Sequence, residues 1–269
     1  MKRNSSIQLL VQGFLLLLLS FIALSCQKVI SVDLNSAAPE IVIEGNISDS
    51  LGPYYVTLSK TVNFDQPNTF PPVAGAHIVM SDNLGHSDLL TETSLSGTYV
   101  ASTLQGTPGK TYTLDVTADG EEYVASSTMP LPVGIDSLVI ENSPFGSNLR
   151  KLIDVHFTDP AGIKNYYRFV VMRNGIISPN IYLYDDRLQD GQPITSILSV
   201  DTLQTGDALV VFLQGIDEGV YNYFRTAAQI SGDRGSFSAS PANPLSNFNN
   251  GALGYFSACA VRSKLIIAP

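Results

Sequence analysis

The sequence predicts a mainly β protein, and three observations support this fold class. Short segments in which apolar and polar residues alternate recur along the chain, and turn signals rich in Gly, Pro, Asn and Asp separate them. Helical periodicity is evident in a single segment, residues 217–231. The chain of 269 residues is 44% hydrophobic and 14% charged, so it can bury a core in one large domain or two ordinary ones. We therefore expect a β-sandwich followed by a second β-rich domain with one helix.

The first 25 residues have the three parts of an export signal. Lys2 and Arg3 form a positive n-region, and residues 13–24 form an apolar h-region of the expected length. The small residues that follow end at Cys26 and resemble the lipobox of bacterial lipoproteins, with two of its positions in reversed order. The resemblance implies that this cysteine carries a lipid.

We therefore expect residues 1–25 to be removed as a signal peptide, Cys26 to be the lipid anchor and residues 26–38 to be a tether. The alternative is an uncleaved anchor helix over residues 7–24, which is marginally long enough to span a membrane. With Cys26 lipidated, Cys259 has no disulfide partner. Its small and apolar neighbours indicate a buried core residue rather than a nucleophile.

Residues 39–130 are predicted to form the first β-sandwich. The clearest strand is residues 110–117, where Tyr112, Leu114 and Val116 share one face. Asp119-Gly120 is typical of a tight hairpin turn after it. The other strands expected in this domain are residues 41–47, 54–59, 76–81, 97–101 and 122–126.

A Pro-containing segment at residues 129–134 marks the expected boundary, and residues 131–269 are predicted to form the second domain. Its helix has Asp217 at the N-cap position and Gly232 where a helix should stop. The apolar stripe of this helix consists of Val220, Tyr223, Phe224, Ala227 and Ile230. The strands expected in this domain are residues 136–141, 152–158, 165–173, 181–184, 208–215 and 254–265.

Three parts of the chain together resemble a known family. They are EGNISD followed by YYVTLSK in residues 44–60, TDPAG with NYYRF in residues 158–169, and PANPLSN running into GALGYF in residues 241–256. With the lipobox, they resemble the Bacteroidota lipoproteins grouped as domain-of-unknown-function family 4249. The resemblance covers essentially the whole mature chain and implies an outer-membrane lipoprotein, often encoded beside a TonB-dependent transporter. It brings no catalytic residues.

Residues 72–76 and 107–112 are similar to the carboxypeptidase-regulatory or transthyretin-like sandwiches of outer-membrane proteins. The first domain is therefore expected to be an Ig-like or transthyretin-like β-sandwich.

The sequence predicts no catalytic residues, metal site or cofactor. Its histidines lack metal-ligand spacing and are predicted to be solvated or satisfied in the core. They are His77, His86 and His156. The most closely spaced acidic cluster consists of Asp185, Asp186 and Asp190, and carboxylates are suitable ligands for Ca²⁺. The spacing does not match an EF-hand, however, and Arg187 lies among the three residues. A solvated turn is therefore favoured over a calcium site. A carboxylate pair for glycoside hydrolysis depends on separation in space, so the sequence selects none.

Residues 243–251 form a turn-rich loop, for which a contact surface is the weaker hypothesis. The favoured interpretation is that its Asn-Pro and Asn-Gly pairs shape turns. The candidate contact residues are Asn243, Pro244, Asn247 and Asn250.

The net charge of −9, which becomes −11 without the basic signal, disfavours nucleic acid as a partner. We predict a non-catalytic binding or assembly component held by its lipid at the outer membrane, facing the periplasm or the cell surface, and accessory to a TonB-dependent transporter. Two alternatives stay open: a surface hydrolase of glycan or peptide, and a purely structural envelope protein.

Overall fold

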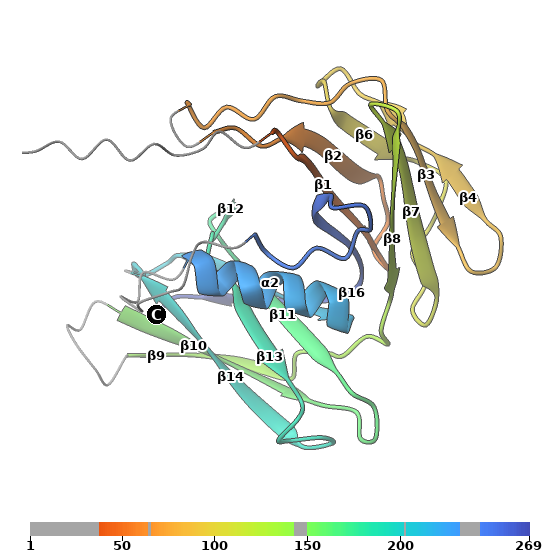
Figure 1. Ribbon diagram of the computed structural model, residues 1–269. Coiled ribbons are helices and arrows are strands. Elements are labelled where there is room, and N and C mark those ends of the chain that lie inside the picture. Colours follow the sequence, from red (N-terminus) through yellow and green to blue (C-terminus); the bar gives the residue numbers. More distant parts are fainter. Residues whose placement is uncertain (1–37, 64–65, 143–149, 202, 232–242) are drawn as a thin grey trace, which may run out of the picture. The chain divides into compact units, whose positions relative to one another are not determined.

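Strands make up most of the protein, as the alternating pattern predicts, and Figure 1 shows their arrangement in a computed structural model. The structure describes residues 38–63, 66–142, 150–201, 203–231 and 243–269. The predicted signal peptide, Cys26 and the tether up to residue 37 lie outside the described residues. Among the described residues, no helix combines the length and apolar character needed to cross a membrane.

The N-terminal sandwich packs one half of a long sheet against a separate four-stranded sheet. Strands β1 (Ile41–Ser48), β2 (Tyr54–Lys60), β6 (Thr98–Ala101) and β5 (Thr91–Glu92) are neighbours in the long sheet. The opposing sheet has the order β4-β3-β7-β8, with β3 at His77–Asp82, β4 at Ser87–Leu89, β7 at Thr111–Ala118 and β8 at Glu121–Thr128. Every second side chain of β1 and β7 is buried, and the buried side chains of the two sheets pack against each other. Ile43 and Ile47 of β1 lie in one core with Tyr112, Leu114 and Val116 of β7.

The second sandwich repeats this plan with the other half of the long sheet. Strands β11 (Tyr166–Arg173), β15 (Ala208–Ile216), β12 (Ile176–Ile177) and β13 (Tyr182–Asp185) extend the long sheet. A three-stranded sheet covers them, made of β9 (Ser137–Asn142), β10 (Arg150–Thr158) and β14 (Pro193–Asp201). The sequence prediction missed β14, although its buried Ile194, Leu198 and Val200 are spaced at even intervals along it.

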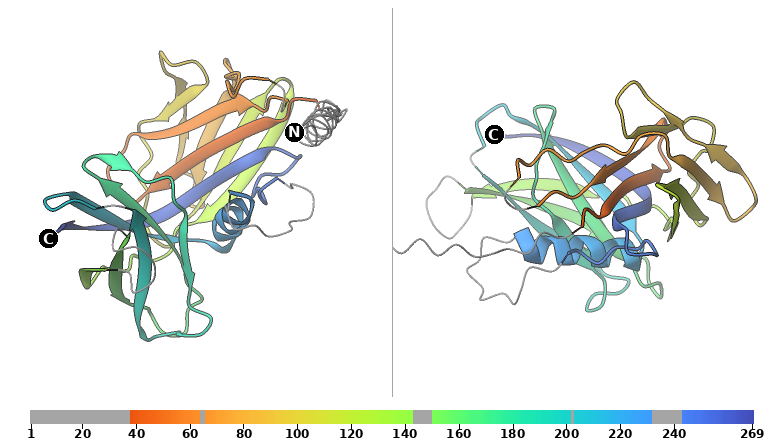
Figure 2. Two further views of the ribbon diagram at one scale, coloured as in Figure 1. Left: turned by 90° about the vertical axis from the view of Figure 1, so that its left-hand side faces the viewer. Right: turned by 45° about the horizontal axis from the view of Figure 1, so that its top comes forward.

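The last strand, β16 (Leu253–Ile267), belongs to both halves and departs from the expected domain arrangement. Its first part pairs in parallel with β1, from Leu253 opposite Val42 to Cys259 opposite Ser48. Its second part pairs antiparallel with β15, so the nine strands form one sheet. Figure 2 shows this blue strand passing from beside the orange β1 toward the second half. The expected domain of residues 131–269 therefore shares its final strand with the core of residues 39–130.

The one helix among the described residues, α2 (Glu218–Ser231), lies where the sequence predicts it. Asp217 caps it, because its Oδ1 accepts the N–H of Val220 at 2.9 Å. Val220 and Phe224 are buried against the sheet, but the predicted stripe ends early and Ile230 is 49% exposed. Gly232, the expected stop, lies outside the described residues. The helix covers the face of the long sheet opposite the two sandwich cores, which Figure 1 shows as a helix in front of the strands.

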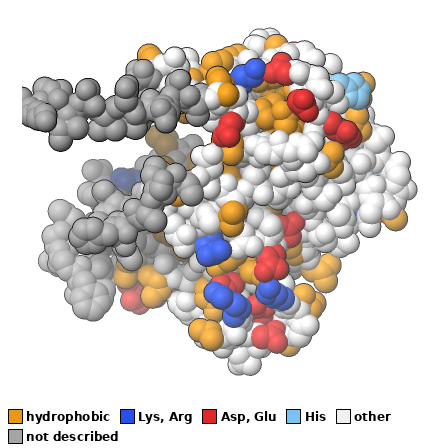
Figure 3. Space-filling model, in the orientation of Figure 1, with side chains coloured by type: hydrophobic (Ala, Val, Ile, Leu, Met, Phe, Trp, Pro, Cys, Tyr) orange, Lys and Arg blue, Asp and Glu red, His pale blue; other side chains and the backbone are white. Residues whose placement is uncertain are grey.

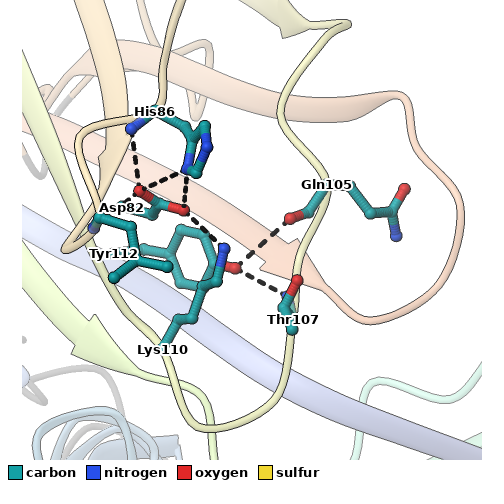
Figure 4. Close-up of polar contacts among 7 residues, drawn as sticks. Asp82, His86, Gln105, Thr107, Lys110 and Tyr112 are labelled. Carbon is teal, nitrogen blue, oxygen red and sulfur yellow. Dashed lines mark hydrogen bonds and ion pairs between the residues drawn. The ribbon is translucent and has the colours of Figure 1, made fainter.

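The side chain of Tyr112 holds the turn that precedes β7 (Figure 4). This turn lies in residues 107–112, which resemble a segment of transthyretin-like sandwiches. The hydroxyl of Tyr112 accepts the N–H of Thr107 at 2.7 Å and donates to the carbonyl of Gln105 at 3.4 Å. A buried tyrosine that bonds back to the backbone just upstream is a known feature of Ig-like sandwiches.

A candidate ligand pocket around Arg168

A row of polar side chains crosses the α2-covered face of the long sheet. Arg168 on β11 lies opposite Gln214 on β15, which in turn lies opposite Val261 on β16. Because side chains alternate across a strand, these residues share the face opposite Tyr167 and Leu213, which are in the second core. On β1, the same face carries Asn46 and Ser48. The register of four strands therefore brings residues from distant parts of the chain to one place.

These residues line a pocket of about 140 Å³ beside α2. Four strands and the helix each contribute to its wall. The lining consists of Asn46, Ser48, Arg168, Gln214, Phe224, Tyr255, Ser257, Cys259 and Val261. The pocket thus combines one guanidinium with amide and hydroxyl groups beside the apolar side chains of Phe224 and Val261, and its volume suits a small polar group rather than a large ligand.

The charge of Arg168 is only partly compensated within the protein. Its Nη1 donates to Gln214 Oε1 at 2.9 Å, and its guanidinium carbon lies 4.1 Å from the centre of the Phe224 ring. Its Nε is buried without a hydrogen-bond partner. No described acidic side chain forms an ion pair with it, and loss of hydration lowers its pKa.

The thiol of Cys259 forms part of the pocket wall but is not activated there. Burial raises the pKa of Cys259 to about 12, and the nearby Arg168 only partly opposes this shift. Since the thiolate is the nucleophilic form, the thiol is protonated and inert near neutral pH. Burial likewise raises the pKa of the Tyr255 hydroxyl. The prediction of a buried Cys259 is confirmed, and the pocket holds a neutral thiol beside a cation.

The acidic cluster assembles differently from the sequence grouping. Asp159, Asp186 and Asp190 each place a carboxylate oxygen within 4.8 Å of the others. Asp185 lies apart, because its carboxylate binds Arg187 Nε at 2.7 Å and Tyr221 Oη at 2.7 Å. Asp159, which the sequence grouping did not include, follows the end of β10. It lies 26 or more positions before the other acidic residues, so only the tertiary structure shows that it belongs to the cluster.

Each of the three clustered carboxylates accepts a hydrogen bond from a backbone N–H group. Asp159 accepts the N–H of Gly191 at 3.0 Å, and Asp190 accepts the N–H of Gly162 at 2.8 Å. Asp186 accepts the N–H of Asn165 at 2.7 Å. The cluster therefore ties the loop after β10 to the loop after β13.

A second polar hollow of about 260 Å³ lies at the N-terminal part of α2. Its charges are largely paired, since Lys164 Nζ is 2.9 Å from Glu218 Oε1 and Arg187 pairs with Asp185. Figure 3 shows basic and acidic side chains intermixed on this face. These charges neutralise one another and most are exposed to solvent, whereas the charge of Arg168 has no acidic partner among the described residues.

None of the three histidines lines the Arg168 pocket or the hollow beside α2. His86 approaches Asp82 at 2.9 Å, and His156 Nδ1 lies 2.9 Å from Thr195 Oγ1. His77 begins β3 and is exposed. Among the described residues they join no group with metal-ligand geometry.

The loop of residues 243–251, for which the sequence favours turn formation over a contact surface, makes hydrogen bonds within the protein. Asn247 bonds both backbone groups of Phe256, with Nδ2 2.7 Å from its carbonyl and Oδ1 2.9 Å from its N–H. Asn250 has a positive φ of 51° and donates to the carbonyl of Glu122 at 2.7 Å. Asn243 is exposed and reaches Glu40, and Pro244 is half-buried. We assign the loop a structural role in holding β16.

Sequence reasoning did not single out Arg168. It lies in a strand as one charged residue in a run of aromatic and apolar ones, NYYRFVVM, and that isolation was the available signal. Its companions Asn46, Gln214 and Ser257 gave none, because strand pairing alone brings them together.

A family model described as "Domain of unknown function (DUF4249)" matches residues 27–265. No curated protein matches the chain. Among solved structures, a two-domain fibronectin type III segment from chicken tenascin aligns with 10% sequence identity and a TM-score of 0.23, covering 67% of this chain and 92% of that chain. We draw no functional conclusion from so distant a structural similarity.

Proposed function

This chain belongs to the family described as Domain of unknown function (DUF4249), and we propose that it is a lipid-anchored outer-membrane lipoprotein that binds a ligand without transforming it. In this proposal Cys26 carries the lipid, and the folded part of the chain offers the Arg168 pocket to a small molecule or to a group on a larger partner. The partner class that fits best is a TonB-dependent transporter, with which the lipoprotein would share its ligand or form a complex.

The Arg168 pocket carries the binding part of the proposal. A half-buried guanidinium whose Nε is buried without a hydrogen-bond partner, and which has no acidic partner among the described residues, is costly to keep, and a bound group of suitable chemistry offsets that cost. The protonated Cys259 thiol in the same wall supports binding rather than covalent catalysis. The anchoring part rests on the export signal and lipobox of residues 1–26.

The anchor is tested by replacing each cysteine in turn. Cys26→Ala should move the protein from the membrane fraction to the soluble envelope fraction, because acyl chains on that residue provide the stable attachment. Cys259→Ala is the matched control and should remain in the membrane. Retention of the Cys26→Ala protein in washed membranes would contradict the anchor.

The partner is tested separately by purifying the protein from its native membranes after mild crosslinking. A TonB-dependent transporter should be recovered with the wild-type protein. Recovery of the lipoprotein without any transporter would leave the anchored binding protein but remove the transporter from the proposal.

A further inference from the structure

We propose that the Arg168 pocket recognises a carboxylate group, so that the ligand is a monoanionic organic acid or a carboxylate-bearing part of a larger molecule. This inference rests on the proposed binding function and names the chemistry of its ligand. Its starting point is that Arg168 places a positive charge in the pocket while no acidic residue lines it.

The hydrogen-bond inventory of Arg168 shows what is missing. A guanidinium has five N–H donors in a planar fork, and the protein occupies only one with a described acceptor, Gln214 Oε1. Nε is orphaned, and Nη2 makes no hydrogen bond to a described residue. Phe224 contributes the face of its ring, which attracts the cation but accepts no N–H in the plane of the fork. A carboxylate would supply both the missing charge and the missing acceptors.

The rest of the pocket suits the same group. Asn46, Ser48 and Ser257 lie on the adjacent strands β1 and β16 and offer amide and hydroxyl donors. Asn46 lies opposite Ser257 and Ser48 lies opposite Cys259 in the strand register, so these donors are neighbours in the wall of the pocket that Arg168 also lines. They can bind the second carboxylate oxygen, while Phe224 and Tyr255 provide apolar contact for the adjoining carbon atoms.

The charge balance favours a monoanion over a phosphate dianion. Arg168 is the only basic residue among those lining the pocket. Arg262, on the neighbouring part of β16, is already paired with Asp49 at 2.7 Å. Glu44 lies on the same face of β1, opposite Tyr255. A second negative charge on the ligand would therefore have no positive partner in the pocket wall, and Glu44, which acts electrostatically on Tyr255 in that wall, would disfavour it.

The test is a thermal unfolding series on the full chain in detergent, with sodium acetate as the probe. Sodium chloride at equal ionic strength and neutral acetamide are the reference solutes. Saturating acetate should raise the unfolding temperature by about 2–4 °C over chloride, because a ligand that binds only the folded state stabilises it. Acetamide, which has the same shape without the charge, should give no such rise.

Variants assign the effect to the pocket. Arg168→Gln should abolish the acetate response, and Asn46→Leu, at an exposed position in the pocket wall, should abolish it without disturbing the core. Arg225→Gln is the matched control, because Arg225 is an exposed basic residue on α2 outside the pocket. The inference is overturned if acetate acts no better than chloride, if phosphate acts more strongly than acetate, or if Asn46→Leu responds like the wild type.

The outcome is independent of the anchoring and transporter tests. A transporter recovered with a protein that ignores acetate would leave the proposed function standing and remove the carboxylate. A specific acetate response in a protein without anchor or partner would leave the pocket chemistry standing and remove the proposed cellular role.

Discussion

Two charged residues in this protein show how the surroundings decide what a side chain does. Asp82 at the end of β3 is almost fully buried and accepts hydrogen bonds from Lys110 Nζ at 2.8 Å and His86 Nδ1 at 2.9 Å (Figure 4). It also accepts the N–H of Leu84 at 2.9 Å. Arg168 is in the opposite condition, with a single hydrogen-bond acceptor from the protein. A satisfied carboxylate stabilises a turn, whereas the unsatisfied guanidinium is the feature on which the proposed ligand site rests.

The first prediction concerns how acid pH changes the contribution of Asp82 to folding stability. The hydrogen bond from Lys110, followed by those from His86 and the backbone, holds the pKa of Asp82 well below its usual value. The unfolded chain, with an ordinary aspartate pKa of about 3.9, therefore takes up a proton first as the pH falls. The contribution of Asp82 to stability is complete above about pH 5 and is lost progressively below it.

Asp82→Asn should accordingly lower the urea midpoint at pH 7, and the difference from wild type should shrink as the pH falls from 4 toward 2. Lys110→Gln should reproduce much of the loss at pH 7, since it removes the strongest partner. A difference between wild type and Asp82→Asn that stays constant from pH 7 to 2.5 would disprove this account.

At the scale of elements, β16 is the strand on which the arrangement depends. It pairs with β1 on one side and β15 on the other, and its residues enter two cores and the α2 interface. The parallel pairing with β1 requires very close approach at Gly254, which has a φ of 93° and lies against Ile43. A Cβ at this position would fall 2.0 Å from the carbonyl oxygen of Ile43. Only glycine satisfies both conditions.

The second prediction follows from this contact. Gly254→Ala should lower the free energy of unfolding by about 3 kcal/mol or more, because it combines an unfavourable φ with overlap on a backbone atom. Gly251→Ala is the matched control: φ is 75° there and nothing lies within 4 Å of the added Cβ, so the cost should be about 1 kcal/mol. Equal denaturant midpoints for the two variants would show that the Ile43 contact is unimportant.

At the scale of the whole molecule, the two sandwiches are joined by more than the linker between them. The long sheet is continuous through β16, and the described chain from Ala38 to Pro269 forms one unit. Asp217 adds a second connection, since the residue that caps α2 also accepts the hydroxyl of Ser127 at 2.6 Å at the end of β8. Ser127 in turn accepts the N–H of Ala258 in β16 at 2.8 Å.

The third prediction is that both halves unfold in one transition. Phe256→Ala removes a fully buried ring from the first core, and Leu213→Ala truncates a buried side chain in the second. Each should cost about 3–5 kcal/mol and shift the same denaturation curve. Circular dichroism should follow the whole sheet, while hydrogen exchange should follow β7 and β14 separately. Two transitions, each moved by only one of the variants, would show that the halves are independent.

The sequence by itself determined the local features of this protein. Alternation in β1 and β7, the helical stripe with its Asp217 cap, and the buried character of Cys259 were all predictable, because each depends on a few neighbouring residues. The family was also recognisable from short motifs, of which GALGYF includes the Gly254 that the β1–β16 pairing requires.

Only the tertiary structure decided which strands become neighbours, and the candidate site depends on that. The pairing of β1 with β16 joins residues more than 200 positions apart, and no local pattern encodes such a partner. The same pairing divides β16 between two sandwiches and puts Asn46 and Ser257 on the sheet face that carries Arg168. Separately, the loops after β10 and β13 bring Asp159 beside Asp186. Side-chain chemistry was present in the sequence from the start, but its convergence is a property of the sheet register.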